Sequence, residues 1–167
     1  RLGLAAVSAV ALGLGLAACS SGPSIALDPE ADPREARRLL SELAAAGPVP
    51  VAIRGEAPLA APDLRRAIER GVRGLRVTTQ AAADESRRLV LDYSGSGDPP
   101  CDDPAARRQV FDPARVRLSL CDGERAVASA ATLRTGEPER VVWRLVGALA
   151  PDDYPDTYGF NLFGSRF

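Results

Sequence analysis

Two alternating segments around an Asp-Gly pair constrain the fold of this chain more than any other feature. Residues 115–121 (RVRLSLC) carry an apolar side chain at every second position, which is typical of a strand with one buried face. Residues 124–133 (ERAVASAATL) predict a second strand, and Asp122-Gly123 between them indicates a two-residue type I′ turn. The pattern therefore predicts an antiparallel hairpin, and with it a sheet whose apolar face needs a cover.

Three segments with apolar residues at helical spacing predict that cover. The first begins at Asp32, an N-cap residue, with Glu35 placed to complete a capping box, and it ends before Gly47. The second begins near Pro62, and the third begins near Pro138. The stripes expected to be buried comprise Leu64, Ala67, Ile68, Gly71, Val72 and Leu75 in the second helix, and Val142, Leu145, Val146 and Leu149 in the third.

Further short strands are expected at 49–54, 75–79 and 87–93, where apolar and β-branched residues recur. Pro50 indicates either an edge strand or the start of a strand, because it lacks the N–H of a central strand. Residues 32–150 therefore predict a two-layer α+β domain. It comprises a small, mostly antiparallel sheet that two or three helices cover on one face.

The first 18 residues differ from the rest of the chain. Residues 2–18 are almost purely Leu, Ala, Val and Gly. A helix needs about 20 apolar residues to cross a bilayer, so the shorter run favours a secretory signal. Two possibilities remain open besides a lipoprotein signal: an ordinary signal peptide that is cleaved and in which Cys19 plays no part, and a weak membrane anchor.

The end of this run, Leu16-Ala17-Ala18-Cys19, resembles the lipobox of bacterial lipoprotein signal peptides. The resemblance implies lipid attachment to the Cys19 sulfur, cleavage before Cys19 and acylation of the new amino group. Residues 1–18 would then be the signal peptide, and 19–31 the lipidated cysteine and a flexible tether. The acyl chains would hold the protein in the membrane.

The resemblance also implies a location in the bacterial cell envelope. In well-studied lipoproteins, Asp after the lipidated cysteine favours retention in the inner membrane. Ser20 stands there in this chain, which favours the outer membrane, with the domain facing the periplasm. The order of predicted elements is similar to that of small outer-membrane assembly lipoproteins, without a shared motif.

Cys101 and Cys121 remain after Cys19 is assigned to lipid, and in an oxidising compartment they predict a disulfide. The bond would tie the loop at 94–104 back to the edge of the sheet. A redox pair would need Cys-x-x-Cys spacing, and a zinc site would need more ligands than the chain offers. We therefore expect no metal and no cofactor.

The basic residues narrow the range of functions. All 21 are arginines, and the chain has no histidine, lysine or methionine. This excludes a Schiff-base lysine, a P-loop lysine and a Ser-His-Asp triad. A net charge of −1 argues against a nucleic-acid partner. Ser94-Gly95-Ser96-Gly97 lacks both the nucleophile-elbow spacing and a histidine to activate its serine. The chain is therefore expected not to be an enzyme.

Arginines gather on the predicted helix after Pro62, opposite its apolar stripe. An anionic lipid or glycan is one candidate ligand for this cluster, since arginine offers a planar fork to phosphate. The alternative is a solvated helix face, neutralised by Asp63 and Glu69. The cluster comprises Arg65, Arg66, Arg70 and Arg73.

Residues 151–167 hold most of the aromatic side chains. They form either a partner-binding segment or a strap that buries its rings against the domain. The aromatic residues are Tyr154, Tyr158, Phe160, Phe163 and Phe167.

Acidic residues also cluster twice, in the Cys101 loop and among these aromatics, without the spacing of an EF-hand calcium site. The first cluster comprises Asp98, Asp102 and Asp103, and the second comprises Asp152, Asp153 and Asp156.

Taken together, these patterns predict a membrane-anchored, non-enzymatic envelope lipoprotein that acts by binding an envelope protein partner or by assisting assembly. Two other functions are kept as alternatives. One is a module that binds anionic glycan or lipid through its arginine-rich helix face. The other is a cell-wall hydrolase that depends on a pair of carboxylates.

Overall fold

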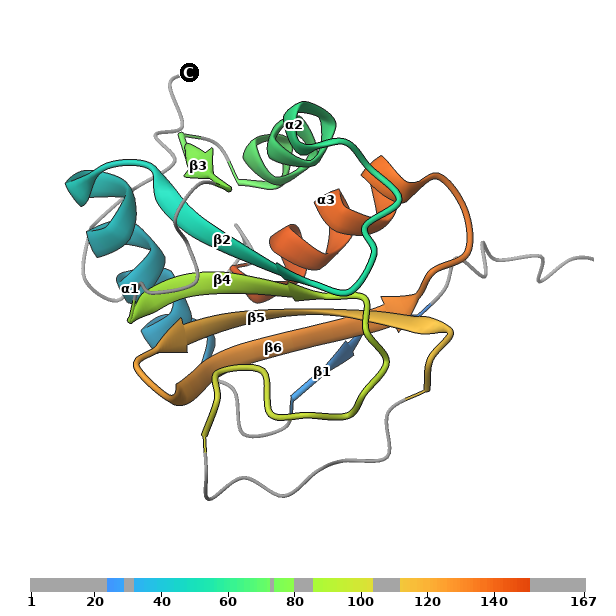
Figure 1. Ribbon diagram of the computed structural model, residues 1–167. Helices are drawn as coiled ribbons and strands as arrows, with labels where there is room; N and C mark the ends of the chain where they lie inside the picture. The colour runs from blue at the N-terminus through green and yellow to red at the C-terminus, as the bar shows by residue number, and fades with distance from the viewer. Residues whose placement is uncertain (1–23, 29–31, 73, 80–85, 104–111, 151–167) are drawn as a thin grey trace, which may run out of the picture.

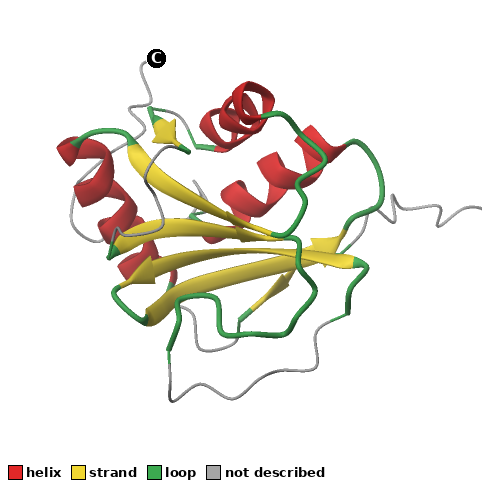
Figure 2. Ribbon diagram, in the orientation of Figure 1, coloured by secondary structure: helices red, strands yellow, loops and turns green. Residues whose placement is uncertain are grey.

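The structure is a computed structural model, and it describes residues 24–28, 32–72, 74–79, 86–103 and 112–150. These residues form a six-stranded sheet and three helices (Figures 1 and 2). In chain order the elements are β1 (Ala26–Leu27), α1 (Pro33–Ala46), β2 (Val49–Arg54), α2 (Ala61–Gly71), β3 (Val77–Thr78), β4 (Arg87–Asp92), β5 (Arg115–Asp122), β6 (Arg125–Leu133) and α3 (Pro138–Leu149).

The sheet has the strand order β1-β6-β5-β4-β2-β3 and is mixed. The pairs β1–β6, β6–β5 and β5–β4 are antiparallel, whereas β2 runs parallel to both of its neighbours, β3 and β4. The prediction of a mostly antiparallel sheet therefore describes only the β1-to-β4 part. Because α2 connects β2 to β3, the chain returns across the sheet and enters β3 in the same direction as β2.

The hairpin of β5 and β6 is confirmed, but its turn lies one residue later than predicted. Asp122 pairs with Arg125, so the turn residues are Gly123 and Glu124. Gly123 has φ +64°, and no positive φ occurs at Glu124, which is typical of a type II′ turn rather than type I′. Val127 is an extra residue in β6, since Leu120 faces Ala128 and Cys121 faces Ala126.

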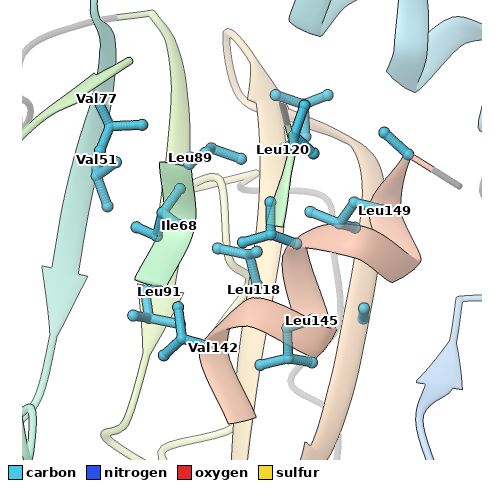
Figure 3. Packing of buried hydrophobic residues seen from close by; sticks show 14 of the residues in the cluster. Val51, Ile68, Val77, Leu89, Leu91, Leu118, Leu120, Val142, Leu145 and Leu149 are labelled. Atoms are coloured by element: carbon cyan, nitrogen blue, oxygen red, sulfur yellow. The ribbon is translucent and has the colours of Figure 1, made fainter. Parts of the chain in front are cut away.

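One face of the sheet carries the apolar core. Side chains from β2, β4 and β5 pack there against buried side chains of all three helices (Figure 3). Figure 1 shows α2 and α3 on this side of the sheet, and the loop between β4 and β5 on the other. The residues labelled in Figure 3 are Val51, Ile68, Val77, Leu89, Leu91, Leu118, Leu120, Val142, Leu145 and Leu149.

The predicted start of α1 is confirmed, but the capping box is not. Asp32 is the N-cap, and its Oδ1 accepts a hydrogen bond of 2.9 Å from the Arg34 amide. The Glu35 carboxylate instead accepts two hydrogen bonds from Arg125 of β6, and this hydrogen bonding lowers the pKa of Glu35. Glu35 therefore ties the helix to the sheet rather than closing its own first turn.

The stripe predicted for the second helix extends past the helix itself. Leu64, Ala67 and Ile68 are buried within α2, which ends at Gly71. Val72 and Leu75 are also buried, but they lie in the connection to β3. Apolar spacing alone does not separate a helical residue from a buried loop residue that follows it.

Residues 19–31 were expected to form a flexible tether, but within the described residues 24–28 Ala26 and Leu27 form β1, which pairs with Ala130 and Ala131 of β6. Pro50 was expected to mark either an edge strand or the start of a strand, and the structure shows the start of a strand, since β2 lies between β3 and β4. The proline is accommodated at the second residue of the strand, opposite Thr78 in the register with β3.

Candidate functional site

The arginine cluster of α2 is exposed, as its spacing predicts. Arg65, Arg66 and Arg70 lie on the solvent side of the helix, and Arg76 is exposed in the connection that leads to β3. Arg73, the fourth arginine of the predicted cluster, lies outside the described residues. The surface is therefore defined here by the described members, and we call Arg65, Arg66, Arg70 and Arg76 the arginine surface.

The two acids expected to neutralise this surface do so only in part. Asp63 forms an ion pair with Arg66, one helical turn along α2. Glu69 instead accepts a 3.2 Å hydrogen bond from the Val77 amide of β3. The side chains of Arg65 and Arg70 make no hydrogen bond or ion pair with any other described residue. The surface therefore retains positive charge that the described residues do not balance.

Trp143 extends the candidate site onto α3. Its side chain is 43% exposed, although its neighbours Val142 and Leu145 are fully buried. The two helices meet at this position, because a Cβ placed on Gly71 would lie 2.9 Å from the Trp143 carbonyl oxygen. An exposed tryptophan thus stands where α3 borders the helix that carries the arginine surface.

The second face of the sheet carries a row of charges that sequence reasoning missed. Arg54 of β2, Asp92 of β4 and Arg117 of β5 are register partners across three adjacent strands. Arg117 Nη2 donates a 2.8 Å hydrogen bond to Asp92 Oδ2, and the Asp92 side chain is fully buried. This row could have been predicted from the alternation of β4 and β5, which places charged residues at the positions that face away from the core.

Asp92 is held in its ionised form despite its burial. Burial alone would raise the pKa of Asp92, but hydrogen bonds from Ser94 and the nearby Arg117 guanidinium outweigh it, so the pKa is lowered. The Ser94 amide and hydroxyl donate to Asp92 Oδ1 at 2.8 Å and 2.6 Å. The carboxylate therefore fixes the start of the loop after β4 and is poorly suited to act as a general base.

The loop at 94–103 is fastened onto this face of the sheet. Arg54 Nη1 donates to the Pro99 carbonyl oxygen at 2.7 Å, and Arg117 Nη2 donates to the Asp98 carbonyl oxygen at 2.6 Å. Asp102 receives Arg54 at 2.5 Å on one carboxylate oxygen and Arg88 at 2.7 Å on the other. The arginines of three strands thus act as a clamp on the loop.

The disulfide predicted between Cys101 and Cys121 is present, with 5.5 Å between the two Cα atoms. Its position differs from the prediction, because Cys121 belongs to β5, in the interior of the sheet. The bond fastens the loop to an interior strand, close to the end of β5 that leads into the turn, and not to an edge strand. Val90 is buried beside the two cysteines, with Ala52 and Ala126 packed around them.

A depression of about 540 Å³ lies where this loop meets β2. Serines and aspartates line it, but Arg54 already neutralises Asp102, and Ser94 is bonded to Asp92. Within the described ranges, no group of three metal-ligating side chains is close enough together to hold a metal ion, and this includes Asp98, Asp102 and Asp103. The lining residues are Arg54, Ser94, Ser96, Asp98, Pro99, Asp102 and Asp103.

A second cavity, of about 410 Å³, lies beyond the carboxyl end of β4. Tyr93 lines it, and burial raises the pKa of Tyr93 to about 12, although the Arg134 guanidinium opposes the shift. Arg134 lies over the tyrosine ring and donates to the carbonyl oxygens of Tyr93 and Arg115. The buried Tyr93 hydroxyl has no hydrogen-bond partner among the residues that the structure describes. The remaining lining residues are Glu56, Ala57, Pro58, Val116, Pro138 and Val141.

The other predicted site residues fall outside the described part of the chain. These are Cys19 with its lipobox, and the tail aromatics Tyr154, Tyr158, Phe160, Phe163 and Phe167. Among the helices that the structure describes, none combines the length and the apolar character needed to cross a bilayer.

Comparison of the chain with protein-family models, with curated proteins and with solved structures finds no match in any of the three.

Proposed function

We propose that the protein is a lipid-anchored domain of the bacterial cell envelope that acts by binding or assembly rather than by catalysis. Cys19 carries the acyl chains, and the domain is held at the outer membrane, facing the periplasm, where it engages an envelope protein. In this proposal the sheet and its helices form a two-layer α+β scaffold for the binding surface.

The observation that carries the proposal is the disulfide between Cys101 and Cys121. Structural disulfides form and persist in exported proteins and are rare in the reducing cytosol. The disulfide supports export, and export is what the Leu16-Ala17-Ala18-Cys19 sequence also requires. These two features lie far apart in the chain and support the same compartment independently.

The lipidation is tested by the mass of one peptide. Trypsin cleaves after arginine, so mature protein should yield an N-terminal peptide of residues 19–34. We expect its mass to include a diacylglyceryl group and an amide-linked acyl chain, and Cys19→Ala to leave the protein unprocessed or released from membranes. Ser20→Ala is the matched control and should be processed normally. Unmodified Cys19 in membrane-bound protein would contradict the proposal.

The binding role is tested on protein extracted from membranes in mild detergent. We expect a stoichiometric complex with a second envelope protein. If the loop at 94–103 helps to shape the binding surface, reduction of the disulfide should dissociate this complex. A monomer with no bound protein would contradict the assembly role and leave the anchoring role standing.

A second candidate function is a module for anionic glycan or lipid. Arg65, Arg70 and Arg76, which no described acid neutralises, favour it. Arginine binds phosphate and carboxylate groups through its planar fork. Binding to an anionic ligand that weakens as salt is raised, and that is lost when these arginines are replaced by glutamine, is the expected outcome.

A further inference from the structure

We propose that the outer surface of α2 and α3 docks on an anionic membrane, with Trp143 seated among the lipid headgroups and the arginine surface on the phosphates. The proposal rests on the lipid anchor at Cys19 proposed above, and it adds the orientation of the domain on the bilayer. Four observations carry it: the distribution of unpaired arginines, the exposure of Trp143, the contact between the two helices and the length of the tether.

The first observation is where the unpaired cations lie. Among the described arginines, those whose side chains make no hydrogen bond or ion pair with another described residue are Arg65, Arg70 and Arg76. All three belong to α2 or to the connection after it, within a stretch of 12 residues. Several exposed arginines elsewhere pair with acids, as Arg125 does with Glu35 and Arg87 with Asp122.

Such a concentration of unpaired positive charge is suited to an anionic surface. Each arginine near a membrane of anionic lipids contributes about 1 kcal/mol of attraction, or about fivefold in affinity. The attraction is not lost to competing ion pairs here, because the acids of α2 are engaged by Arg66 and by the Val77 amide.

Trp143 supplies the second part of the surface. A tryptophan that is 43% exposed places a large apolar ring in water, together with an N–H that can donate to a headgroup oxygen. Tryptophan is enriched where proteins meet the membrane–water interface for this reason. Its backbone carbonyl lies beside Gly71, the last residue of the helix that bears the arginines.

The length of the tether limits how far the domain can stand from the membrane. Six residues separate Cys19 from Ala26, and the seven Cα-to-Cα steps between them span at most about 25 Å. Ala26 begins β1, which pairs with β6, and α3 packs on β5 and β6. The anchor therefore enters the domain at the side of the sheet that supports α3.

Because Trp143 is the only tryptophan in the chain, its fluorescence reports docking directly. The mature chain without acyl groups, residues 19–167 with Cys19→Ala, is mixed with vesicles of phosphatidylcholine alone or with added phosphatidylglycerol. We expect a shift of the emission to shorter wavelength, and quenching by brominated lipid, only with phosphatidylglycerol. The response should weaken as salt is raised, since salt screens the attraction.

Matched triple variants separate the arginine surface from net charge. Replacing Arg65, Arg70 and Arg76 by glutamine should weaken vesicle binding by about a hundredfold, at about fivefold for each arginine. The control replaces three arginines that are paired with acids and changes the net charge equally, so it should retain most of the binding. The control residues are Arg38, Arg115 and Arg125.

Trp143→Ala should also weaken binding, measured by sedimentation with the vesicles. Equal losses in the two triple variants, or no emission shift with phosphatidylglycerol, would overturn the proposal. An emission shift produced by an envelope protein partner and not by vesicles would also overturn it, assigning the surface to protein.

The outcome also separates this proposal from the one on which it rests. Acylated Cys19 with no response from Trp143 would retain the anchor and reject the docking surface. Vesicle binding by a chain whose Cys19 is never acylated would reject the anchor and retain the surface.

Discussion

Asp92 and Arg117 form a buried ion pair across the two central strands β4 and β5, with 2.8 Å between Oδ2 and Nη2. The same guanidinium donates to the Asp98 carbonyl oxygen, and Asp92 accepts from the Ser94 amide. The pair therefore joins the sheet to the loop after β4 at two points, Ser94 and Asp98. It stabilises the face of the sheet opposite the apolar core.

We expect Asp92→Asn to lower the free energy of unfolding by about 3–5 kcal/mol, because removing one partner leaves a buried guanidinium without its counter-charge. Urea denaturation measures the change. Asp122→Asn is the matched control, since its ion pair with Arg87 is exposed and should contribute less than about 1 kcal/mol. Similar losses in the two variants would contradict a special role for the buried pair.

The same carboxylate predicts how stability depends on acid. Its pKa is lower in the folded chain than in the unfolded chain, where it is about 3.9. The unfolded state therefore binds a proton first, and the stabilisation present above that pKa is lost as the pH falls through the folded value. The difference in unfolding free energy between wild type and Asp92→Asn should shrink below about pH 4. A difference that stays constant across the acid range would contradict this assignment.

Replacing Cys101 and Cys121 together by alanine should lower the unfolding free energy by about 3 kcal/mol, as expected for a bond closing a loop of this size. The cysteines are 20 residues apart. Thermal unfolding with and without a reductant measures the effect. The reductant should lower the Tm of the wild type only, and an equal shift in the alanine variant would show that it acts elsewhere.

The contact between α2 and α3 predicts opposite effects for two glycines. A Cβ at Gly71 would lie 2.8 Å from Val146 Cβ and 2.9 Å from the Trp143 carbonyl, so Gly71→Ala should force the helices apart and destabilise by about 1–3 kcal/mol. At Gly147 the nearest atom would be 3.9 Å away. Gly147→Ala should therefore stabilise by up to about 1 kcal/mol through helix propensity. Destabilisation by both, measured in urea, would contradict the packing.

Tyr93→Phe should raise the unfolding free energy by about 1 kcal/mol, because the buried hydroxyl has no hydrogen-bond partner to lose. Alkaline pH provides a second readout. Burial raises the folded pKa of Tyr93 to about 12, so the unfolded chain loses its proton first and wild-type stability falls above about pH 10. The phenylalanine variant should lack this component, and an unchanged alkaline profile would contradict it.

Local patterns predicted the elements of the core well. Alternation over β5 and β6 located the hairpin, and the spacing of Val142, Leu145, Val146 and Leu149 located α3 and its buried side. The pairing of Cys101 with Cys121 followed from counting cysteines in a chain that was expected to be exported. The hairpin and the helix depend on residues that are close in sequence. The disulfide depends on a pairing for which only one partner cysteine remained.

The predictions that failed concern partners distant in sequence. Glu35 could close its own helix turn or pair with Arg125, and the choice depends on β6 lying beside α1. Ala26 and Leu27 form a strand rather than part of a flexible tether because β6 lies beside them and pairs with them. Neither outcome is encoded in the neighbouring residues.

The candidate site shows the same division. The sequence by itself determined that α2 has an arginine-rich side, because helical periodicity places those residues opposite Leu64, Ala67 and Ile68. Only the tertiary structure decided which arginines are neutralised, since Glu69 accepts from the Val77 amide and no acid among the described residues pairs with Arg65 or Arg70. It likewise decided that Arg54, Asp92 and Arg117 form one row, because strand register, not sequence, brings them together. Periodicity specifies which side of an element faces solvent, whereas the partner of a charge depends on long-range packing.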